Sequence, residues 1–413
     1  MTEFFSTLRV NADRMHDSFI HQALIGATGD GGVSRVTFSD AHLAARNWFR
    51  AETESAGLEF HTDGAGNHSA ILSNDGRDKT LLIGSHLDSV PNGGRFDGAL
   101  GVVAALEVLK TVKENRITPG VRLEAIDFTD EEGSFIGLLG SSALTDRLDP
   151  DALKKPRGGR DGLVEGLARA GLSEAGFFTA VRPKDSLAGY LELHIEQGKR
   201  LERTGTNIGI VSAIVGIRSR RVSFIGRADH AGSTLMTDRA DASLGASAFT
   251  LAARELVMRD FSNCVVNVGK MDFAPGAFNI VPARVDLALE FRSPDEGEFD
   301  RLEVALAACA KEQAARFGLE LQTQRFENHV PNLMSAEIKK AFADSCDDLG
   351  LTHSSLISGA IHDGQSFDGV CPMGMIFVPS VDGASHAPRE FTKWDDCVNG
   401  ANVLLQTVLK LAA

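Results

Sequence analysis

The 413-residue sequence predicts an α/β fold, a mixed and mostly parallel sheet covered by helices, with a second α+β domain inserted into the first. Three observations predict this fold. A strand, a polar loop, a helix and a second strand follow one another in residues 80–128, which is the order of a βαβ unit. From about Val211 onward, alternating strands and two long helical patterns replace that order. Beyond about Glu327 the first pattern returns, so we expect the chain to re-enter the first domain.

The larger domain is expected to comprise residues 1–211 and 327–413. Its residues 150–183, rich in Gly, Arg and Lys, are predicted to form a surface loop with a short helix. Apolar spacing and turn residues predict the other regular elements of this domain. They are helices at 41–56, 100–112, 336–348 and 394–411, and strands at 80–84, 121–128, 188–194 and 374–378.

The inserted domain is expected at residues 212–326, with about four strands and two helices. Alternating apolar residues predict three of the strands, and helical apolar spacing predicts the two helices. A fourth strand is expected after the second helix. The strands are placed at 220–225, 265–271 and 283–292, and the helices at 240–258 and 296–316.

Composition and charge exclude several classes of protein. The sequence has 42 Lys and Arg against 56 Asp and Glu, a net charge of −14, and an acidic surface repels nucleic acid. No apolar run approaches the roughly 18 residues of a membrane span, and residues 1–19 carry acids where a secretion signal is apolar. Five cysteines without a C-x-x-C pair argue against a disulfide framework or a zinc ribbon. We therefore expect a cytoplasmic protein without nucleic-acid or membrane partners.

Polar side chains stand at the ends of several predicted strands. Taken singly, a histidine is more often structural than a ligand, and a pair of acids is usually solvated surface. Several such residues directly after buried strands are less easily explained in that way, because ligands gather at the carboxyl ends of the strands in this kind of sheet. The residues are His86, Asp88, Asp97, Glu131, Glu132, His194 and, late in the chain, His386.

Five of these residues supply three imidazoles and two carboxylates, a ligand set for two divalent ions about 3.5–4 Å apart. The set suits zinc best, with manganese and cobalt as alternatives. One carboxylate must stay free to deprotonate water, and Glu131 is the candidate general base. Asp88 is expected to orient the imidazole of His86, with a solvated turn residue as the alternative. The expected ligands are His86, Asp97, Glu132, His194 and His386.

These residues lie in motifs that resemble one family. The resemblance is to the hydantoinase/carbamoylase branch of the zinc aminoacylase and carboxypeptidase superfamily, which includes N-carbamoyl-L-amino-acid hydrolases, β-ureidopropionases and allantoate amidohydrolases. The motifs occur in the family's order and cover most of the chain. They are SHLDSVPNGGRFDG (85–98), DEEG (130–133), LELHIEQG (191–198), HAG (230–232), NIVP (279–282) and FVPS (377–380) followed by Ser385-His386.

The resemblance implies a dinuclear site. One ion would take His86, Asp97 and His194, and the other would share Asp97 as a bridge with Glu132 and His386. Glu131 matches the family's general base. The inserted domain matches a lid that also forms a homodimer.

The resemblance also implies a small substrate that carries a carboxylate. Residues matching Asn279 and Arg292 hold that carboxylate in the family, and the one matching His230 polarises the scissile carbonyl. Without the motif, an ion pair of Arg292 with Asp295 or Glu290 would be the better interpretation. Gln197 and His362 are also placed at the substrate. The chain departs from the family pattern at Ser233, Leu235, Ile361 and Gly364, and in residues 133–140, which leaves the particular substrate open.

The expected reaction is hydrolysis of a linear amide or ureido bond, most simply of an N-carbamoyl-L-amino acid, by metal-bound hydroxide formed with the help of Glu131. An aminoacylase or dipeptidase on the same metals is the first alternative. A non-catalytic binding protein on this fold is the second. A dinucleotide enzyme is disfavoured, because the loop at residues 93–98 is not G-x-G-x-x-G and carries an acid.

Overall fold

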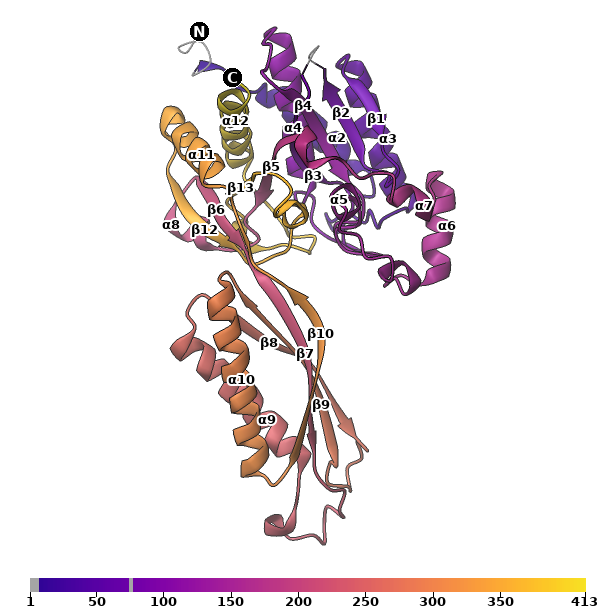
Figure 1. Cartoon of the computed structure of the whole chain (residues 1–413), viewed down its shortest axis with the longest axis vertical. Helices are drawn as coiled ribbons and strands as arrows, with labels where there is room; N and C mark the ends of the chain where they lie inside the picture. The colour runs from indigo at the N-terminus through magenta and orange to yellow at the C-terminus, as the bar shows by residue number, and fades with distance from the viewer. Residues whose placement is uncertain (1–6, 74–76) are drawn as a thin grey trace. The chain divides into compact units, whose positions relative to one another are not determined.

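The computed structural model describes residues 7–73 and 77–413. The first six residues, part of the segment used above to argue against a secretion signal, lie outside the described residues. The chain forms two compact units. The larger contains the residues up to Ser212 and Leu333–Ala413, and the smaller contains Ala213–Asn332 (Figure 1). The expected boundaries were 211/212 and 326/327, so the second crossing lies six residues later than expected.

The larger unit is built on a nine-stranded mixed sheet. Its four central strands, β4, β3, β5 and β13, are parallel to one another, whereas β2 and β6 join them antiparallel on either side. This arrangement confirms the predicted fold class. The strand order is β1 (Glu59–Thr62), β2 (His68–Leu72), β4 (Arg122–Phe128), β3 (Thr80–His86), β5 (Leu187–Ile195), β13 (Met373–Val378), β6 (Ile208–Ile214) and β11 (Asn332–Leu333), with β12 (His353–Ser358) paired to β6.

Helix α4 (Ala99–Glu114) packs against β3, β4 and β5 and is buried along almost its whole length. A helix that is apolar on all sides belongs in a core, and its few charges have partners there. Glu107 pairs with Arg14 at 2.7 Å, and Lys110 pairs with Glu52 at 2.6 Å. The other helices of this unit are α2 (Ala12–Leu24), α3 (Asp40–Ser55), α5 (Leu139–Leu144), α6 (Arg160–Ala170), α7 (Glu174–Phe177), α8 (Arg200–Thr204), α11 (Ala336–Leu349) and α12 (Trp394–Leu411).

Residues 150–183 contain more helix than expected. Two α-helices, α6 and α7, take the place of a loop with one short helix. The reason is a separate small core, in which Leu163 and Leu167 of α6 and Phe177 of α7 are buried beside Phe38. The many Gly and Arg residues of the segment predicted a surface loop, because its few apolar residues do not stand out in the composition.

The smaller unit is a four-stranded antiparallel sheet with two helices on one face (Figure 1). The strand order is β10 (Glu320–His329), β7 (Gly216–Ile225), β9 (Arg284–Ser293) and β8 (Val265–Ala274). The helices are α9 (Ala242–Asp260) and α10 (Glu296–Arg316), each beginning after an aspartate, Asp241 or Asp295, whose side chain accepts a backbone N–H. Such caps fix where a helix starts.

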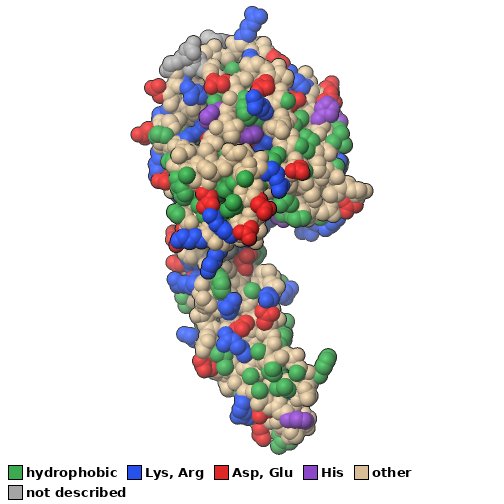
Figure 2. Space-filling model, turned by 90° about the vertical axis from the view of Figure 1, so that its right-hand side faces the viewer, with side chains coloured by type: hydrophobic (Ala, Val, Ile, Leu, Met, Phe, Trp, Pro, Cys, Tyr) green, Lys and Arg blue, Asp and Glu red, His purple; other side chains and the backbone are tan. Residues whose placement is uncertain are grey.

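The surface mixes charges of both signs. Figure 2 shows acidic and basic side chains intermingled on one face of the molecule, with hydrophobic side chains between them. Among the described helices, none is both long enough and apolar enough to cross a membrane. All five cysteines are free thiols.

Candidate metal centre

The centre lies at the carboxyl edge of the parallel strands. His86 is the last residue of β3, and His194 is the last but one of β5. Asp97 stands just before α4, after the Gly-rich loop. Gly98 between Asp97 and the helix has φ +62°, and a Cβ there would lie 2.4 Å from the ring of His86. A glycine is therefore required for the loop to carry Asp97 over the imidazole.

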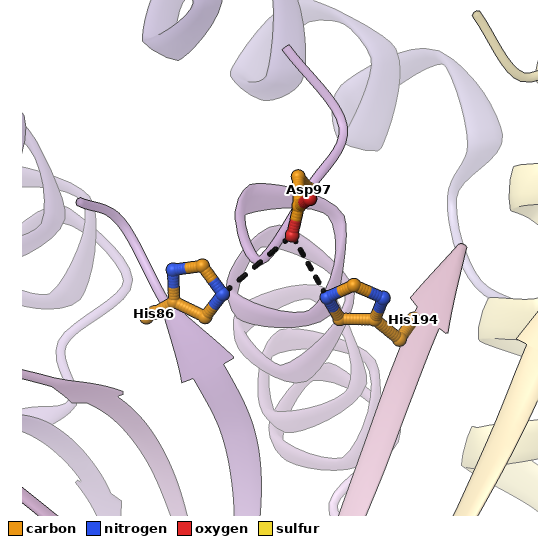
Figure 3. A group of neighbouring side chains, drawn as sticks. All are labelled: His86, Asp97 and His194. Carbon is orange, nitrogen blue, oxygen red and sulfur yellow. Dashed lines mark ion pairs between the residues drawn. The ribbon is translucent and has the colours of Figure 1, made fainter. Parts of the chain in front are cut away.

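His86, Asp97 and His194 form a first group of ligand-type atoms within 4.8 Å of one another (Figure 3). Asp97 Oδ1 lies 3.1 Å from His194 Nε2 and 3.7 Å from His86 Nε2. The other ring nitrogens face backbone carbonyls, His86 Nδ1 that of Asp88 at 3.0 Å and His194 Nδ1 that of Ile195 at 2.9 Å. Carbonyl partners on Nδ1 direct both Nε2 atoms toward Asp97, the orientation in which second-shell groups hold metal-binding histidines.

Asp97, Glu132 and His386 form a second group on the other side of the same aspartate. His386 Nε2 lies 3.5 Å from Asp97 Oδ2 and 3.5 Å from Glu132 Oε2. The two oxygens of Asp97 thus face different sets of side chains. A carboxylate with that geometry can bridge two ions, and the two groups hold the five ligands expected from the sequence.

The electrostatics of the centre favour cations. Burial acts to lower the pKa of His194, but its hydrogen bond with Asp97 and the charges of Asp97 and Glu192 raise that pKa to about 9. Burial, followed by the charges of Asp97 and Asp88, raises the pKa of Glu132 well above its ordinary value. Carboxylates crowded in this way are stabilised as anions by bound divalent ions. Imidazole and carboxylate donors together fit zinc, manganese or cobalt.

Glu131 lies beside the centre but in neither group. Its Oε2 is 3.5 Å from His86 Nε2, and its side chain is 9% exposed. Burial raises the pKa of Glu131 well above its ordinary value, with further contributions from Asp363 and Glu132. A buried carboxylate with a raised pKa is suited to accept a proton and release it again.

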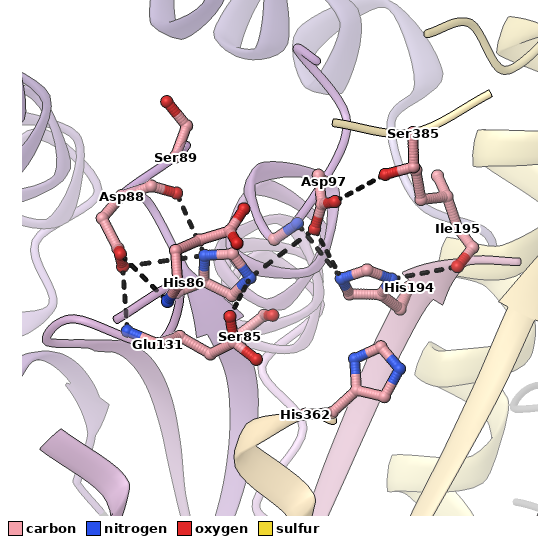
Figure 4. Close-up of polar contacts among 12 residues, drawn as sticks. Ser85, His86, Asp88, Ser89, Asp97, Glu131, His194, Ile195, His362 and Ser385 are labelled. Carbon is pink, nitrogen blue, oxygen red and sulfur yellow. Dashed lines mark hydrogen bonds and ion pairs between the residues drawn. The ribbon is translucent and has the colours of Figure 1, made fainter. Parts of the chain in front are cut away.

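Asp88 contacts the centre in a different way from the one expected. Its backbone carbonyl, rather than its carboxylate, accepts from His86 Nδ1, while the carboxylate stays 3.7 Å from that nitrogen. The carboxylate instead accepts the backbone N–H of Glu131 at 3.3 Å (Figure 4). It also accepts the backbone N–H of Glu132 at 3.2 Å and the hydroxyl of Thr37 at 3.1 Å. Asp88 therefore joins the histidine loop to the two glutamates, a role that the sequence alone did not suggest.

Gln197 and His362 also lie at the centre. Gln197 Nε2 donates to Asp97 Oδ2 at 2.8 Å, from a residue held at φ +55°. The buried His362 ring lies beside that of His194 (Figure 4), 4.5 Å away from centroid to centroid. Its Nε2 lies 2.9 Å from Ser358 Oγ. Both therefore border the proposed ligands, within reach of anything bound there.

His230 and Asn279 belong to the smaller unit, on two neighbouring loops. His230 pairs with Ile280 in an isolated bridge, and the N–H of Ala231 donates to the carbonyl of Asn279 at 3.0 Å. His230 Nδ1 accepts backbone N–H groups from Gly232 and Ser233 at 3.0 and 3.1 Å. Because Nδ1 accepts in this way, Nε2 is the ring nitrogen through which the exposed His230 can donate to another group.

Arg292 lies far from these two residues within the same unit. It stands near the end of β9, whose first residue is Arg284. Asn279 lies five residues before Arg284 in the chain, and the N–H of Val281 donates to the carbonyl of Asp229, next to His230, at 2.8 Å. Arg292 lies eight positions after Arg284 along the strand, about 26 Å away at 3.3 Å per residue. Arg292 NH2 pairs with Glu290 Oε1 at 2.8 Å, the local ion pair considered above as its alternative role. Within a single chain, the smaller unit therefore does not place Asn279 and Arg292 next to each other.

Several residues that organise the centre were not found from the sequence. Arg35, fully buried, donates from Nε to the carbonyl of Leu87 at 2.8 Å, and Arg46 pairs with Asp127 at 3.3 Å below the same loop. Glu390 is buried against the Asp97 segment. Nothing in the spacing of these residues distinguishes them from surface charges. The one available signal was the position of Glu390, four residues after the motif histidine His386.

Known proteins resemble this chain over nearly its full length. The model of peptidase family M20/M25/M40 matches residues 82–410. An N-carbamoyl-L-amino acid amidohydrolase of Geobacillus stearothermophilus is 36% identical over 406 residues, covering 98% of this chain and 99% of the relative. A ureidoglycolate hydrolase of Arabidopsis thaliana is 33% identical, covering 98% and 88%. The crystal structure of an amidase of the hydantoinase/carbamoylase family from Burkholderia multivorans superposes with a TM-score of 0.90 at 32% identity, covering 98% and 99%.

Proposed function

The chain belongs to peptidase family M20/M25/M40 and, within it, to the hydantoinase/carbamoylase amidases, and on that premise we propose that it hydrolyses the ureido C–N bond of an N-carbamoyl-L-amino acid or a related ureido acid. One observation carries the proposal. The two oxygens of Asp97 face two different sets of ligand-type side chains, and Glu131 lies beside them without belonging to either set. That arrangement matches metal-assisted hydrolysis.

Two divalent ions are proposed, one on His86, Asp97 and His194, the other on Asp97, Glu132 and His386. When bound, such ions acidify a water molecule and polarise the scissile carbonyl. Zinc is proposed first because of the three imidazoles, with manganese or cobalt as alternatives.

Glu131 is proposed to move the proton. Its carboxylate would take a proton from the attacking water and then deliver it to the leaving nitrogen of the substrate. Asp88 holds the backbone N–H groups of Glu131 and Glu132 and so keeps the general base and a ligand in register. For a carbamoyl amino acid, the products would be the amino acid, ammonia and carbon dioxide.

The smaller unit is proposed to bind and polarise the substrate. His230 Nε2–H would donate to the oxyanion that develops on the carbonyl. Asn279 and Arg292 would bind the carboxylate, and Arg292 can do so with two parallel N–H groups once it exchanges Glu290 for the substrate. Gln197 and His362 would contact the ureido group from the larger unit.

A homodimer formed through the smaller unit is part of the proposal. A carbamoyl amino acid is far shorter than the roughly 26 Å of strand between the Arg284 end of β9 and Arg292, so His230 and Arg292 of one chain would serve different substrates. A second chain would supply the missing group. The surface of the unit supports this, because β8 is a terminal strand of its sheet, and exposed apolar residues recur every seven positions along α9. They are Leu244, Leu251 and Met258.

The substrate is tested by a panel. The metal-loaded protein would be offered N-carbamoyl, N-acetyl and dipeptide forms of the same L-amino acids, together with ureidoglycolate and allantoate, and ammonia and free amino acid would be measured. Ammonia release from carbamoyl or ureido compounds is expected. Turnover confined to acetyl or dipeptide substrates would instead favour the aminoacylase or dipeptidase alternative, and no turnover with two ions bound would favour a binding protein. The cytoplasmic location expected from the sequence stays a prediction.

A further inference from the structure

Glu390 connects two segments that carry proposed metal ligands. Its side chain is 1% exposed. Oε1 accepts the backbone N–H of Phe96 at 2.8 Å and that of Asp97 at 3.1 Å. Oε2 accepts from Ser385 Oγ at 3.0 Å, and the same hydroxyl lies 2.8 Å from Asp97 Oδ2. A single buried carboxylate thus joins the backbone of the shared aspartate to the residue next to His386.

Gly94 is shaped to accommodate this carboxylate. A Cβ built on Gly94 would lie 1.9–2.1 Å from the carboxyl atoms of Glu390, well inside van der Waals contact. The backbone of Gly94 is not in the left-handed region, so the glycine is needed for space and not for conformation. The Gly-rich loop and Glu390 therefore fit each other, which is unexpected for a solvated acid near the end of the chain.

We infer that Glu390 is a positioning residue that holds the Asp97 segment and the Ser385–His386 segment together, and thereby sets the affinity of the second metal position. The inference rests on the dinuclear site proposed above. The first position draws two of its three ligands, His86 and His194, from buried strand ends that Glu390 does not contact. The second position needs His386, whose side chain is 53% exposed on a loop.

The chemistry of the contacts explains why an acid stands at position 390. Three donors converge on it, two backbone N–H groups and one hydroxyl, and an ionised carboxylate only accepts. A glutamine in the same place keeps one oxygen for Phe96 and Asp97 and turns its amide toward Ser385 Oγ, which can accept. An alanine removes the acceptor of the two backbone N–H groups, whereas the Ser385 hydroxyl keeps Asp97 Oδ2. Buried donors that lose their acceptor destabilise the segment that bears them.

The inference is tested by titrating the metal-free protein with Co²⁺ alone and following both the cobalt absorbance and the bound ions per chain. The wild type is expected to take up two ions. Glu390→Ala and Gly94→Ala should each keep the first ion and weaken the second by about tenfold to a hundredfold, the range for the loss of a partner that orients ligands. Glu390→Gln should restore most of the second affinity. Gly94→Ala should have no added effect in the Glu390→Ala background, because the space is then free.

The outcomes separate this inference from the proposed function. Two ions bound as tightly in Glu390→Ala and Gly94→Ala as in the wild type would overturn the inference and leave the dinuclear site standing. Additive losses in the double variant, or equal weakening of both ions, would overturn it as well. A wild type that binds only one ion would overturn both proposals. If Glu390→Ala does not fold, Gly94→Ala and Glu390→Gln decide in the same way, by loss and by retention of the second ion.

Discussion

The proposed metal centre of the larger unit and the proposed substrate residues of the smaller unit are held in opposite ways. His86 and His194 are 2% and 1% exposed, and each has a carbonyl partner on one ring nitrogen and Asp97 on the other. His230 and Asn279 are exposed on loops. The side chains of the metal centre are therefore held in place by the fold of the larger unit. On our proposal, His230 and Asn279 find their partners in the substrate and in the site to which it is bound.

The two regions would lower the barrier of the proposed reaction in different ways. Groups fixed in a buried site stabilise charge without reorganising when it develops. Exposed loop groups must be ordered on binding, so they suit a step that begins only when substrate is present. A variant that changes one region should therefore leave the other region unchanged.

Replacing Glu131 by glutamine should have the largest effect, because it removes the proposed proton carrier and keeps its size. Turnover is expected to fall by about 10²–10⁴-fold, the usual contribution of general acid–base catalysis. The two metals should remain, since Glu131 lies in neither ligand group. Ammonia release and metal content measured on one preparation check this. A variant that keeps near-normal turnover would refute the assignment of the base.

The next prediction exploits the distance between His230 and Arg292. His230→Ala should lower turnover by about 10²–10³-fold, the usual cost of losing an oxyanion donor. Arg292→Ala should lower turnover because it removes the proposed partner of the substrate carboxylate. Metal binding should be unchanged in both variants. If each substrate site takes these two residues from different chains, mixing the variants restores one of the two sites in every heterodimer. Random exchange of a C₂ dimer then returns about a quarter of wild-type activity.

The control for this experiment is each variant refolded or incubated alone, which should stay inactive. Absence of recovery in a mixture shown to contain heterodimers would mean that both residues act within one chain. That result would contradict the argument from the length of β9. A companion variant carries Leu251→Glu and Met258→Glu on α9 and should convert the protein to monomers. Light scattering would measure the molar mass, and metal analysis should show unchanged metal content.

The difference between the regions also explains what the sequence could predict. Helices α10 and α12 have the bounds expected, because helical apolar spacing is local and Asp295 caps α10 within the same stretch. The candidate ligands His86, Asp97 and His194 could be proposed together because strand ends converge at one edge of a parallel sheet, where the structure groups their side chains. Glu390 was not, since its partner Phe96 lies 294 residues away and only packing brings them together.

A helix that the sequence did not predict and a separation that its motifs do not contain have physical causes of the same kind. Helix α2 was overlooked although Asn11 caps it, because its buried residues Met15 and Phe19 are few among polar neighbours. The separation of Asn279 from Arg292 follows from the pairing of β7 with β9, in which Ile225 faces Arg284 and Ile217 faces Arg292. Strand register is a property of two chain segments, so a motif read along one segment does not contain it.

Acid should destabilise the larger unit through a half-buried histidine, His68. Burial, and then the charge of Arg46, lowers the pKa of His68 from 6.5 to about 2 in the folded chain. Below pH 6.5, His68 is protonated in the unfolded chain but stays neutral in the folded chain. The free energy of unfolding therefore decreases as the pH falls from about 6.5 toward 2. The slope is about 1.4 kcal/mol per pH unit for one histidine.

Both tryptophans, Trp48 and Trp394, lie in the larger unit, so their fluorescence reports its unfolding. Denaturant midpoints measured between pH 5 and 7 should fall toward acid in the wild type and less steeply in His68→Phe, which keeps an aromatic ring beside Phe60. Parallel pH profiles for the two proteins would exclude His68 as the source.

The smallest effect is expected from the cap of α10 in the smaller unit. Asp295 Oδ1 accepts the backbone N–H of Glu298 at 2.6 Å at the start of the helix. Asp295→Ala should lower the stability of this unit by about 1 kcal/mol, the usual cost of losing an N-cap, whereas Asp295→Ser, which can still cap, should lose less. Far-UV circular dichroism should detect the loss while tryptophan fluorescence and metal affinity stay unchanged, because both of those report the larger unit. A shift of equal size in both signals would mean that the two units unfold as one, and that the contrast between them holds for their sites but not for their stability.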